Sequence, residues 1–152
     1  MISFSMNEVM EGYHEMPTLY NKRLPLKFEC TWGTDDLKAF IDSSSPMFLT
    51  CPLSGTIYVE GLCDHAAIRG YLNLNYPKNT LSYEFNFRPA NKRLYLFTGK
   101  KVNVRWWNLP VSHTTCTFNI TNEVDQLIST GVVFFKLKNA LSFIKSLRVN
   151  FT

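Results

Sequence analysis

Polar and apolar residues alternate with a period of two along most of the chain, which is the pattern of half-buried β-strands. The clearest run is 81–87 (LSYEFNF), where every second residue is apolar and every residue between is polar. The same alternation marks 26–32 and 114–120. Further strands are expected over 3–13, 46–51, 55–62, 67–75, 92–105 and 127–137. Side chains alternate between the faces of a strand, so these strands have one apolar face each.

Two turn signals join neighbouring strands. Residues 76–79 (YPKN) and 88–91 (RPAN) carry the Pro and Asn that favour turns. Segments 67–75, 79–88 and 92–105 are therefore expected to form an antiparallel meander. About nine strands with short connections predict a sheet that closes into a barrel, because closure removes exposed edges.

Two short helices are expected to interrupt the strands. Residues 34–36 (TDD) supply an N-cap and an acidic first turn, followed by Leu37, Phe40 and Ile41 on one face. Near the other end, Asn139 can cap a turn over 140–144 (ALSFI). No shift in composition marks a domain boundary, so residues 1–152 are expected to form a single all-β domain with two short helices.

The composition supports a folded protein. Hydrophobic residues make up 45% of the 152 residues and aromatic residues 14%, which is too apolar for intrinsic disorder. With 7 Gly and 7 Pro, fibrous and low-complexity classes are excluded. No apolar run approaches the ~18 residues of a membrane-spanning helix, so no integral membrane segment is expected.

The net charge of +4 is mild, and the basic residues are scattered. Their densest clusters are three dibasic pairs at 22–23, 92–93 and 100–101, which are typical of solvated loop ends. Binding to nucleic acid needs a basic stripe that neutralises several phosphates. We therefore expect no nucleic-acid partner.

The N-terminus and the cysteines favour a reducing compartment. Residues 1–15 carry three Glu and lack both the positive and the continuous apolar regions of a signal peptide. Cys30, Cys51, Cys63 and Cys116 show no C-x-x-C spacing. They are expected to be reduced thiols in a cytoplasmic protein.

An ordered set of segments covers nearly the whole chain and carries a resemblance. The segments are 8–13 (EVMEGY), 28–32 (FECTW), 34–41 (TDDLKAFI), 54–61 (SGTIYVEG), 81–87 (LSYEFNF), 95–102 (YLFTGKKV), 113–118 (HTTCTF) and 141–144 (LSFI). In this order they resemble the domain of about this size found beside cholesterol-oxidase-like glucose–methanol–choline oxidoreductases and some α/β-hydrolases.

That resemblance implies a lipocalin-like or calycin-like antiparallel barrel that accompanies lipid- or sterol-directed enzymes. It implies no catalytic chemistry of its own. The chain contains neither G-x-G-x-x-G nor G-x-S-x-G, so oxidoreductase or hydrolase activity is not carried over. No cofactor is expected.

The histidines and cysteines give no clear catalytic or metal site. His14, His65 and His113 are dispersed, and sequence neighbours on a regular strand face apart, so no metal centre is expected. Cys63 and His65 share a strand face, but 63–65 has the composition of a turn between strands, and no third group is indicated to activate the thiol. Cys116 and His113 differ by three positions and therefore face apart.

Several carboxylates could in principle be paired for acid–base work. They are Glu8, Glu11, Glu15, Glu60 and Asp64. Charged residues rarely point into a barrel, so we expect these side chains on the solvated outer face.

Aromatic residues on the alternating strands are the strongest candidates for a binding site. We predict that one interior face lines an apolar pocket for a lipid, sterol or fatty acid; its residues are Tyr83, Phe85, Phe87, Tyr95, Phe97 and Trp106. Trp106 and Trp107 precede a Pro-containing loop, as expected at a barrel mouth. Arg69 and Arg105 could meet a carboxylate or phosphate head group.

Three functions remain open at this point. The first is a non-catalytic domain that binds an apolar ligand, with a cavity that holds few charges. The second is an accessory module with a filled barrel, which docks on a lipid- or sterol-acting enzyme through exposed Trp107, Leu109 and Val111. The third is a small isomerase or cyclase, which needs a cavity with a buried titratable pair.

Overall fold

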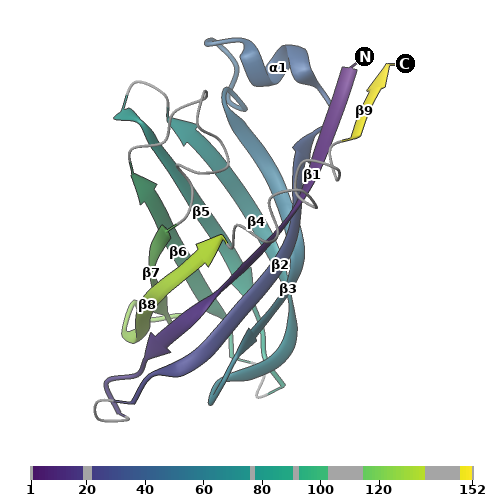
Figure 1. The fold of residues 1–152 in the computed structure, drawn as a ribbon. Coiled ribbons are helices and arrows are strands. Elements are labelled where there is room, and N and C mark those ends of the chain that lie inside the picture. Colours follow the sequence, from purple (N-terminus) through teal and green to yellow (C-terminus); the bar gives the residue numbers. More distant parts are fainter. Residues whose placement is uncertain are drawn as a thin grey trace.

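The computed structural model describes residues 2–18, 22–75, 78–90, 93–102, 115–135 and 148–151. Within these ranges the chain is almost entirely β-structure (Figure 1). The elements are β1 (Ile2–Glu15), β2 (Leu24–Thr34), α1 (Leu37–Ile41), β3 (Thr50–Val59), β4 (Cys63–Asn75), β5 (Thr80–Phe87), β6 (Tyr95–Val102), β7 (Thr115–Thr121), β8 (Leu127–Phe135) and β9 (Arg148–Phe151).

The strands close into an eight-stranded antiparallel barrel. From β2 to β8, each strand pairs with the next, and β1 pairs with both β8 and β2. The ninth strand, β9, lies against the N-terminal end of β1, where Ile2 pairs with Phe151 and Ser5 with Arg148. Both described ends of the chain therefore lie together at one end of the barrel (Figure 1). The predicted all-β antiparallel barrel is confirmed.

The strand predictions hold best where alternation is cleanest. The expected meander is present as β4, β5 and β6. Segments 46–51 and 55–62 were expected as two strands, which is wrong, because β3 is one strand that begins at Thr50. Residues 46–49 form a turn, in which Leu49 has a positive φ of 53° and donates its N–H to the carbonyl of Phe40. The strand β9 was not predicted.

The first predicted helix is confirmed as α1, a single short turn. The Asp36 carboxylate caps it by accepting the backbone N–H of Ala39 at 3.2 Å. Phe40 is buried, and its ring packs edge-on against that of Phe4 at a centroid distance of 5.5 Å. Ile41, expected on the same face, is instead 63% exposed. The second predicted helix, 140–144, lies outside the described residues.

Aromatic rings fill the barrel at mid-height. Phe97 of β6 stacks on Phe85 of β5 at a centroid distance of 4.4 Å and on Phe118 of β7 at 4.8 Å. Phe28 of β2 meets Phe85 and Phe97 edge-on at 5.4 and 5.5 Å. Because β2 and β6 lie opposite each other in the ring of eight strands, these contacts cross the interior. The middle of the barrel is therefore a packed core.

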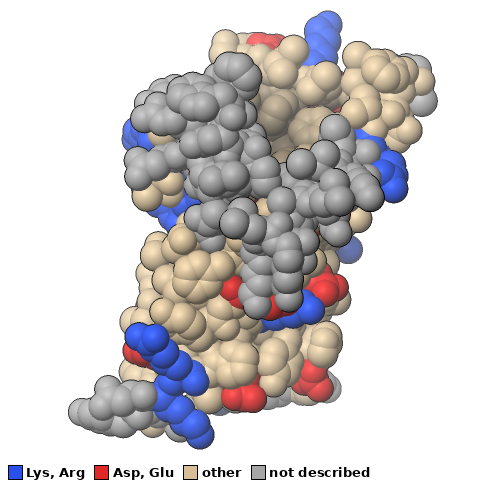
Figure 2. Space-filling model, in the orientation of Figure 1, with Lys and Arg blue, Asp and Glu red and all other residues tan. Residues whose placement is uncertain are grey.

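The outer surface mixes charges of both signs. Acidic and basic side chains are interspersed on the face shown in Figure 2. Among the ion pairs on this surface are those of Arg23 with Glu15 and of Lys27 with both Glu11 and Glu29. This agrees with the scattered basic residues of the sequence. In the described ranges, no helix is both long and apolar enough to cross a membrane.

Candidate functional site

Three polar side chains meet inside the barrel. Glu8 of β1, Tyr83 of β5 and Lys101 of β6 are all buried. The Tyr83 hydroxyl donates to Glu8 Oε1, and Lys101 Nζ donates to Glu8 Oε2 at 3.4 Å. Lys101 Nζ also lies over the Tyr83 ring, 5.1 Å from its centroid. The interior therefore contains an ion pair and a phenol bonded to the same carboxylate.

Burial dominates the electrostatics around this cluster. It raises the pKa of Tyr83 well above its ordinary value, and the adjacent Glu8 carboxylate raises it further. Burial likewise raises the pKa of the neighbouring Cys30 thiol, and takes that of Cys116 to about 12. The phenol and both thiols are therefore neutral at physiological pH. The ion pair of this cluster is formed by Glu8 and Lys101.

The buried position of Glu8 corrects a prediction from sequence. Glu8 was expected on the outer face, but it shares the inward face of β1 with Met10 and His14. Lys101, expected in a solvated dibasic pair, belongs to the inward set of β6, while Lys100 is exposed. The pairing makes both positions tolerable, because a buried charge needs an opposite charge and hydrogen bonds.

A second buried polar contact lies at the other end of β1. His14 Nε2 is 2.9 Å from the carbonyl oxygen of Glu60, and His14 Nδ1 is 2.7 Å from Ser129 Oγ. A carbonyl can only accept, so Nε2 donates to it, and Nδ1 accepts from the Ser129 hydroxyl. Burial lowers the pKa of His14, which favours this neutral imidazole. The side chain ties β1 to β8 and to the end of β3.

Five of the six residues predicted to line a pocket are described, and these five point inward. Tyr83, Phe85, Phe87, Tyr95 and Phe97 are each 5% exposed or less. They contact one another, as in the Phe85–Phe97 stack and the Phe87–Tyr95 stack at 5.6 Å. Their role in holding a ligand stays a prediction. The other predicted residues Arg105, Trp106, Trp107, Leu109 and Val111 lie outside the described residues.

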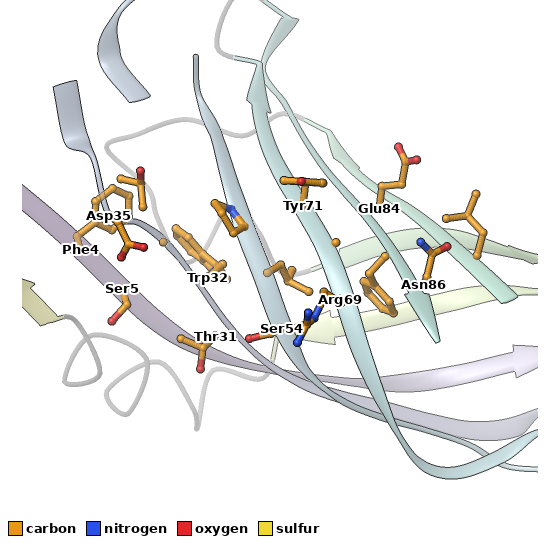
Figure 3. A pocket seen from close by; sticks show the side chains of 17 residues that line it. Phe4, Ser5, Thr31, Trp32, Asp35, Ser54, Arg69, Tyr71, Glu84 and Asn86 are labelled. Carbon is orange, nitrogen blue, oxygen red and sulfur yellow. The ribbon is translucent and has the colours of Figure 1, made fainter. Parts of the chain in front are cut away.

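Arg69, the remaining predicted site residue, is separated from this interior set. It is exposed on the outer face of β4, in a groove of about 850 Å³ that is lined by residues of β1 to β6 (Figure 3). We call this the outer groove; its lining includes Thr31, Ser54, Arg69, Tyr71, Glu84 and Asn86. These six side chains are exposed, and they alternate along their strands with buried or half-buried residues.

Strand register explains how the outer groove is assembled. Arg69 pairs with Ser54 of β3 on one side and with Asn86 of β5 on the other. Two residues along β4, Tyr71 pairs with Pro52 and Glu84 in the same way. Two parallel cross-strand rows of outward side chains therefore line the groove, and Tyr71 is 53% exposed between its neighbours.

Gly70 lies between Arg69 and Tyr71, in the middle of the groove lining. A Cβ at this position would lie 2.0 Å from the carbonyl oxygen of Glu84 and 2.5 Å from the Cα of Phe85. Only glycine lets β4 approach β5 this closely. The sequence signal for this site is thus a glycine flanked by an arginine and a tyrosine on one alternating strand.

Polar groups of the outer groove are available to a ligand. In the part of the chain that the structure describes, the side chains of Arg69, Glu84 and Asn86 make no hydrogen bond or ion pair with the protein. A smaller hollow of about 400 Å³ continues along the outer face of β5 to β8, and Glu84 lines both. This face was not predicted from the sequence as a site, because the apolar half of the alternation belongs to the barrel interior.

His65 and Asp64, considered from the sequence as metal ligands or catalytic groups, lie beside each other on β4. His65 Nδ1 lies 2.5 Å from Asp64 Oδ1, although sequence neighbours were expected to face apart. The reason is the positive φ of 57° at His65, which departs from regular strand geometry. The predicted turn at 63–65 is wrong, since β4 already begins at Cys63. Among described residues, no group of three or more His, Cys, Asp or Glu could hold a metal ion.

Comparison with known proteins does not assign the chain to a family. No protein-family model, curated protein or solved structure matches the chain. The resemblance to domains that accompany lipid- or sterol-directed enzymes therefore stays a prediction.

Proposed function

We propose that the protein is a non-catalytic binding module, in which the barrel interior is a structural core and the outer groove holds the ligand. The observation that carries this proposal is the placement of Arg69, Tyr71, Glu84 and Asn86. These exposed side chains gather in a hollow of about 850 Å³, within the size range of ligand sites. Such a site needs a few convergent polar groups beside an aromatic surface, which is what this face provides.

The packed interior supports a ligand on the outside. Rings from opposite walls of the barrel are in contact at mid-height, so a ligand there would have to displace Phe28, Phe85 or Phe97. Removing such rings from a core costs about 3–5 kcal/mol. The outer groove needs no such rearrangement, because its hollow is already formed.

Both buried polar contacts support a binding rather than a catalytic role. Both oxygens of Glu8 already accept hydrogen bonds, from Tyr83 and Lys101. The hydroxyl of Ser129 is bonded to His14, and both residues have no solvent exposure. General acids, bases and nucleophiles must reach a substrate, so these groups serve the fold.

A second candidate function is favoured by Lys101. Its ammonium carries three donors, and in the described residues its one hydrogen bond is to Glu8. A fatty acid or similar apolar molecule with one polar end could place that end at Lys101 and its chain among Tyr83, Phe85 and Phe97. This is the lipocalin-like binding mode, and a lipid- or sterol-acting enzyme would be its partner.

An NMR titration separates the two candidates. Amide shifts of uniformly ¹⁵N-labelled protein are followed with oleate, with soluble hexasaccharides and with a mixed peptide library. Shifts confined to residues of the outer groove support the first proposal. Shifts centred on Lys101, Phe97 and Tyr83, produced by oleate, overturn it in favour of the second. Native mass spectrometry of freshly purified protein shows in addition whether an apolar molecule is carried along.

A further inference from the structure

We propose that the outer groove binds a neutral oligosaccharide chain. This inference rests on the proposed function, because it names the ligand class of the same groove. A sugar ring presents hydroxyl groups around its edge and C–H groups on its faces. Its binding site therefore combines flat polar side chains with an exposed aromatic ring, and the groove carries both.

Three planar polar groups supply the first half of that chemistry. The guanidinium of Arg69 is donor-only, the carboxylate of Glu84 is acceptor-only, and the amide of Asn86 is both. Adjacent hydroxyls of a sugar donate and accept together, so such flat groups can each bond two of them. None of the three has a hydrogen bond or an ion pair with the described protein.

Tyr71 supplies the other half. Its ring is 53% exposed on the outer face of β4, between Pro52 and Glu84 in the cross-strand register. An exposed tyrosine offers an apolar face and a polar tip, which suits a ligand that is itself apolar on its faces and polar at its rim. Figure 3 shows Tyr71 and Glu84 on adjacent strands, with Arg69 and Asn86 in the row beside them.

The same row continues beyond the groove and suggests a chain rather than a single sugar. Register places Tyr71, Glu84, Thr98, Asn119 and Thr130 opposite one another on five consecutive strands. All five are exposed, and the smaller hollow lies along the last four. Neighbouring strands are about 4.8 Å apart, which is of the order of one pyranose unit along a glycan.

Charge and topology decide against other polymers. Asp35, Arg69 and Glu84 are the acidic and basic residues of the groove lining, with one positive and two negative charges, so an anionic polymer would be repelled. An extended peptide usually binds by adding a strand at a sheet edge. Here β3 to β6 are each paired on both sides, so they offer no such edge.

The test is a titration with neutral hexasaccharides, namely those of β-1,4-glucose, β-1,4-N-acetylglucosamine and α-1,4-glucose. We expect at least one to shift the amides of Arg69, Tyr71 and Asn86 at concentrations up to a few millimolar. Binding should change little between low and high salt, because no net charge is neutralised. An anionic polygalacturonate fragment is titrated in parallel.

Variants connect the binding to the groove. Tyr71→Ala should weaken the affinity about tenfold or more, and Asn86→Ala should weaken it as well. Tyr58→Ala is the matched control, because Tyr58 is on the outer side of β3 away from the groove lining. Thermal unfolding checks that each variant is folded.

The outcomes distinguish this inference from the proposed function. Neutral-sugar binding lost in Tyr71→Ala and kept in Tyr58→Ala supports it. If groove amides shift only with a peptide or with the anionic fragment, the glycan inference is overturned and the binding module stands. If only oleate causes shifts and the groove amides stay unchanged, both the glycan inference and the proposed function fail. The same holds if none of the probes causes a shift.

Discussion

Lys101 and Glu8 form an ion pair across the interior of the barrel, with Lys101 Nζ 3.4 Å from Glu8 Oε2. The side chains are 0% and 2% exposed, and their strands β6 and β1 are separated in the ring by β7 and β8. Desolvating two charges costs about as much as their attraction returns. The pair therefore contributes more to the specific arrangement of β1 and β6 than to the free energy of unfolding. Each of the two side chains is tolerated in the interior only because the other is present.

Removing one partner of this pair should be strongly destabilising. We expect Lys101→Met to lower the free energy of unfolding by about 3–5 kcal/mol, because Glu8 is left as an uncompensated buried charge. The double variant Glu8→Leu with Lys101→Met should recover most of that loss. Urea unfolding of the wild type, Glu8→Leu, Lys101→Met and the double variant measures the coupling, and Lys100→Met on the exposed face is the control. Additive single and double effects would contradict the interior pairing.

His14 should make stability depend on pH. Burial lowers its pKa below the ordinary 6.5, so the folded protein keeps it neutral where the unfolded chain takes up a proton. The unfolded state then binds more protons, and the free energy of unfolding should fall as pH drops below about 6.5 and be level above it. Urea unfolding from about pH 8 to 5.5 measures this slope. His14→Gln should flatten this slope, and a slope that persists in His14→Gln would contradict the assignment to His14.

The four thiols should react in two classes. Cys63 is half-buried, whereas Cys30, Cys51 and Cys116 are buried. Burial raises the pKa of Cys63, and it raises that of Cys51 and of Cys116 to about 12. Little thiolate forms at pH 8, so access to the reagent decides which thiol reacts. Mass spectrometry after iodoacetamide treatment should show one label in the native protein and four in denaturing urea. Rapid native labelling of Cys116 would indicate that the barrel opens beside Lys101.

Alternation was enough to predict the barrel but not its polar interior. Runs such as 81–87 indicate both the strand and its apolar face, because a strand with one apolar face buries that face. The same alternation contains Glu8 and Lys101 at inward positions. They were assigned outward because a charge is usually solvated, and their partners come from strands far apart in sequence. Only the three-dimensional pairing shows why they are buried.

The candidate site was harder to predict for a related reason. Of the eight residues predicted to bind, five form the packed interior, two are outside the described ranges, and Arg69 lies on the opposite face of the sheet wall. The outer groove depends on register, which brings Ser54, Arg69 and Asn86 into one row. No spacing within the sequence encodes that row.

Matched aromatic substitutions should separate the core from the groove. Phe97→Ala removes a ring with no solvent exposure that stacks on Phe85 and Phe118, and we expect it to cost about 3–5 kcal/mol of unfolding free energy. Tyr71→Ala removes an exposed ring and should change stability by only about 0.5 kcal/mol. Urea unfolding of both variants provides the comparison. A small loss of unfolding free energy in Phe97→Ala would mean that the interior is loosely packed and can accept a ligand. A large loss of unfolding free energy in Tyr71→Ala would mean that the groove side chains stabilise the fold, which would contradict their proposed role as a binding surface.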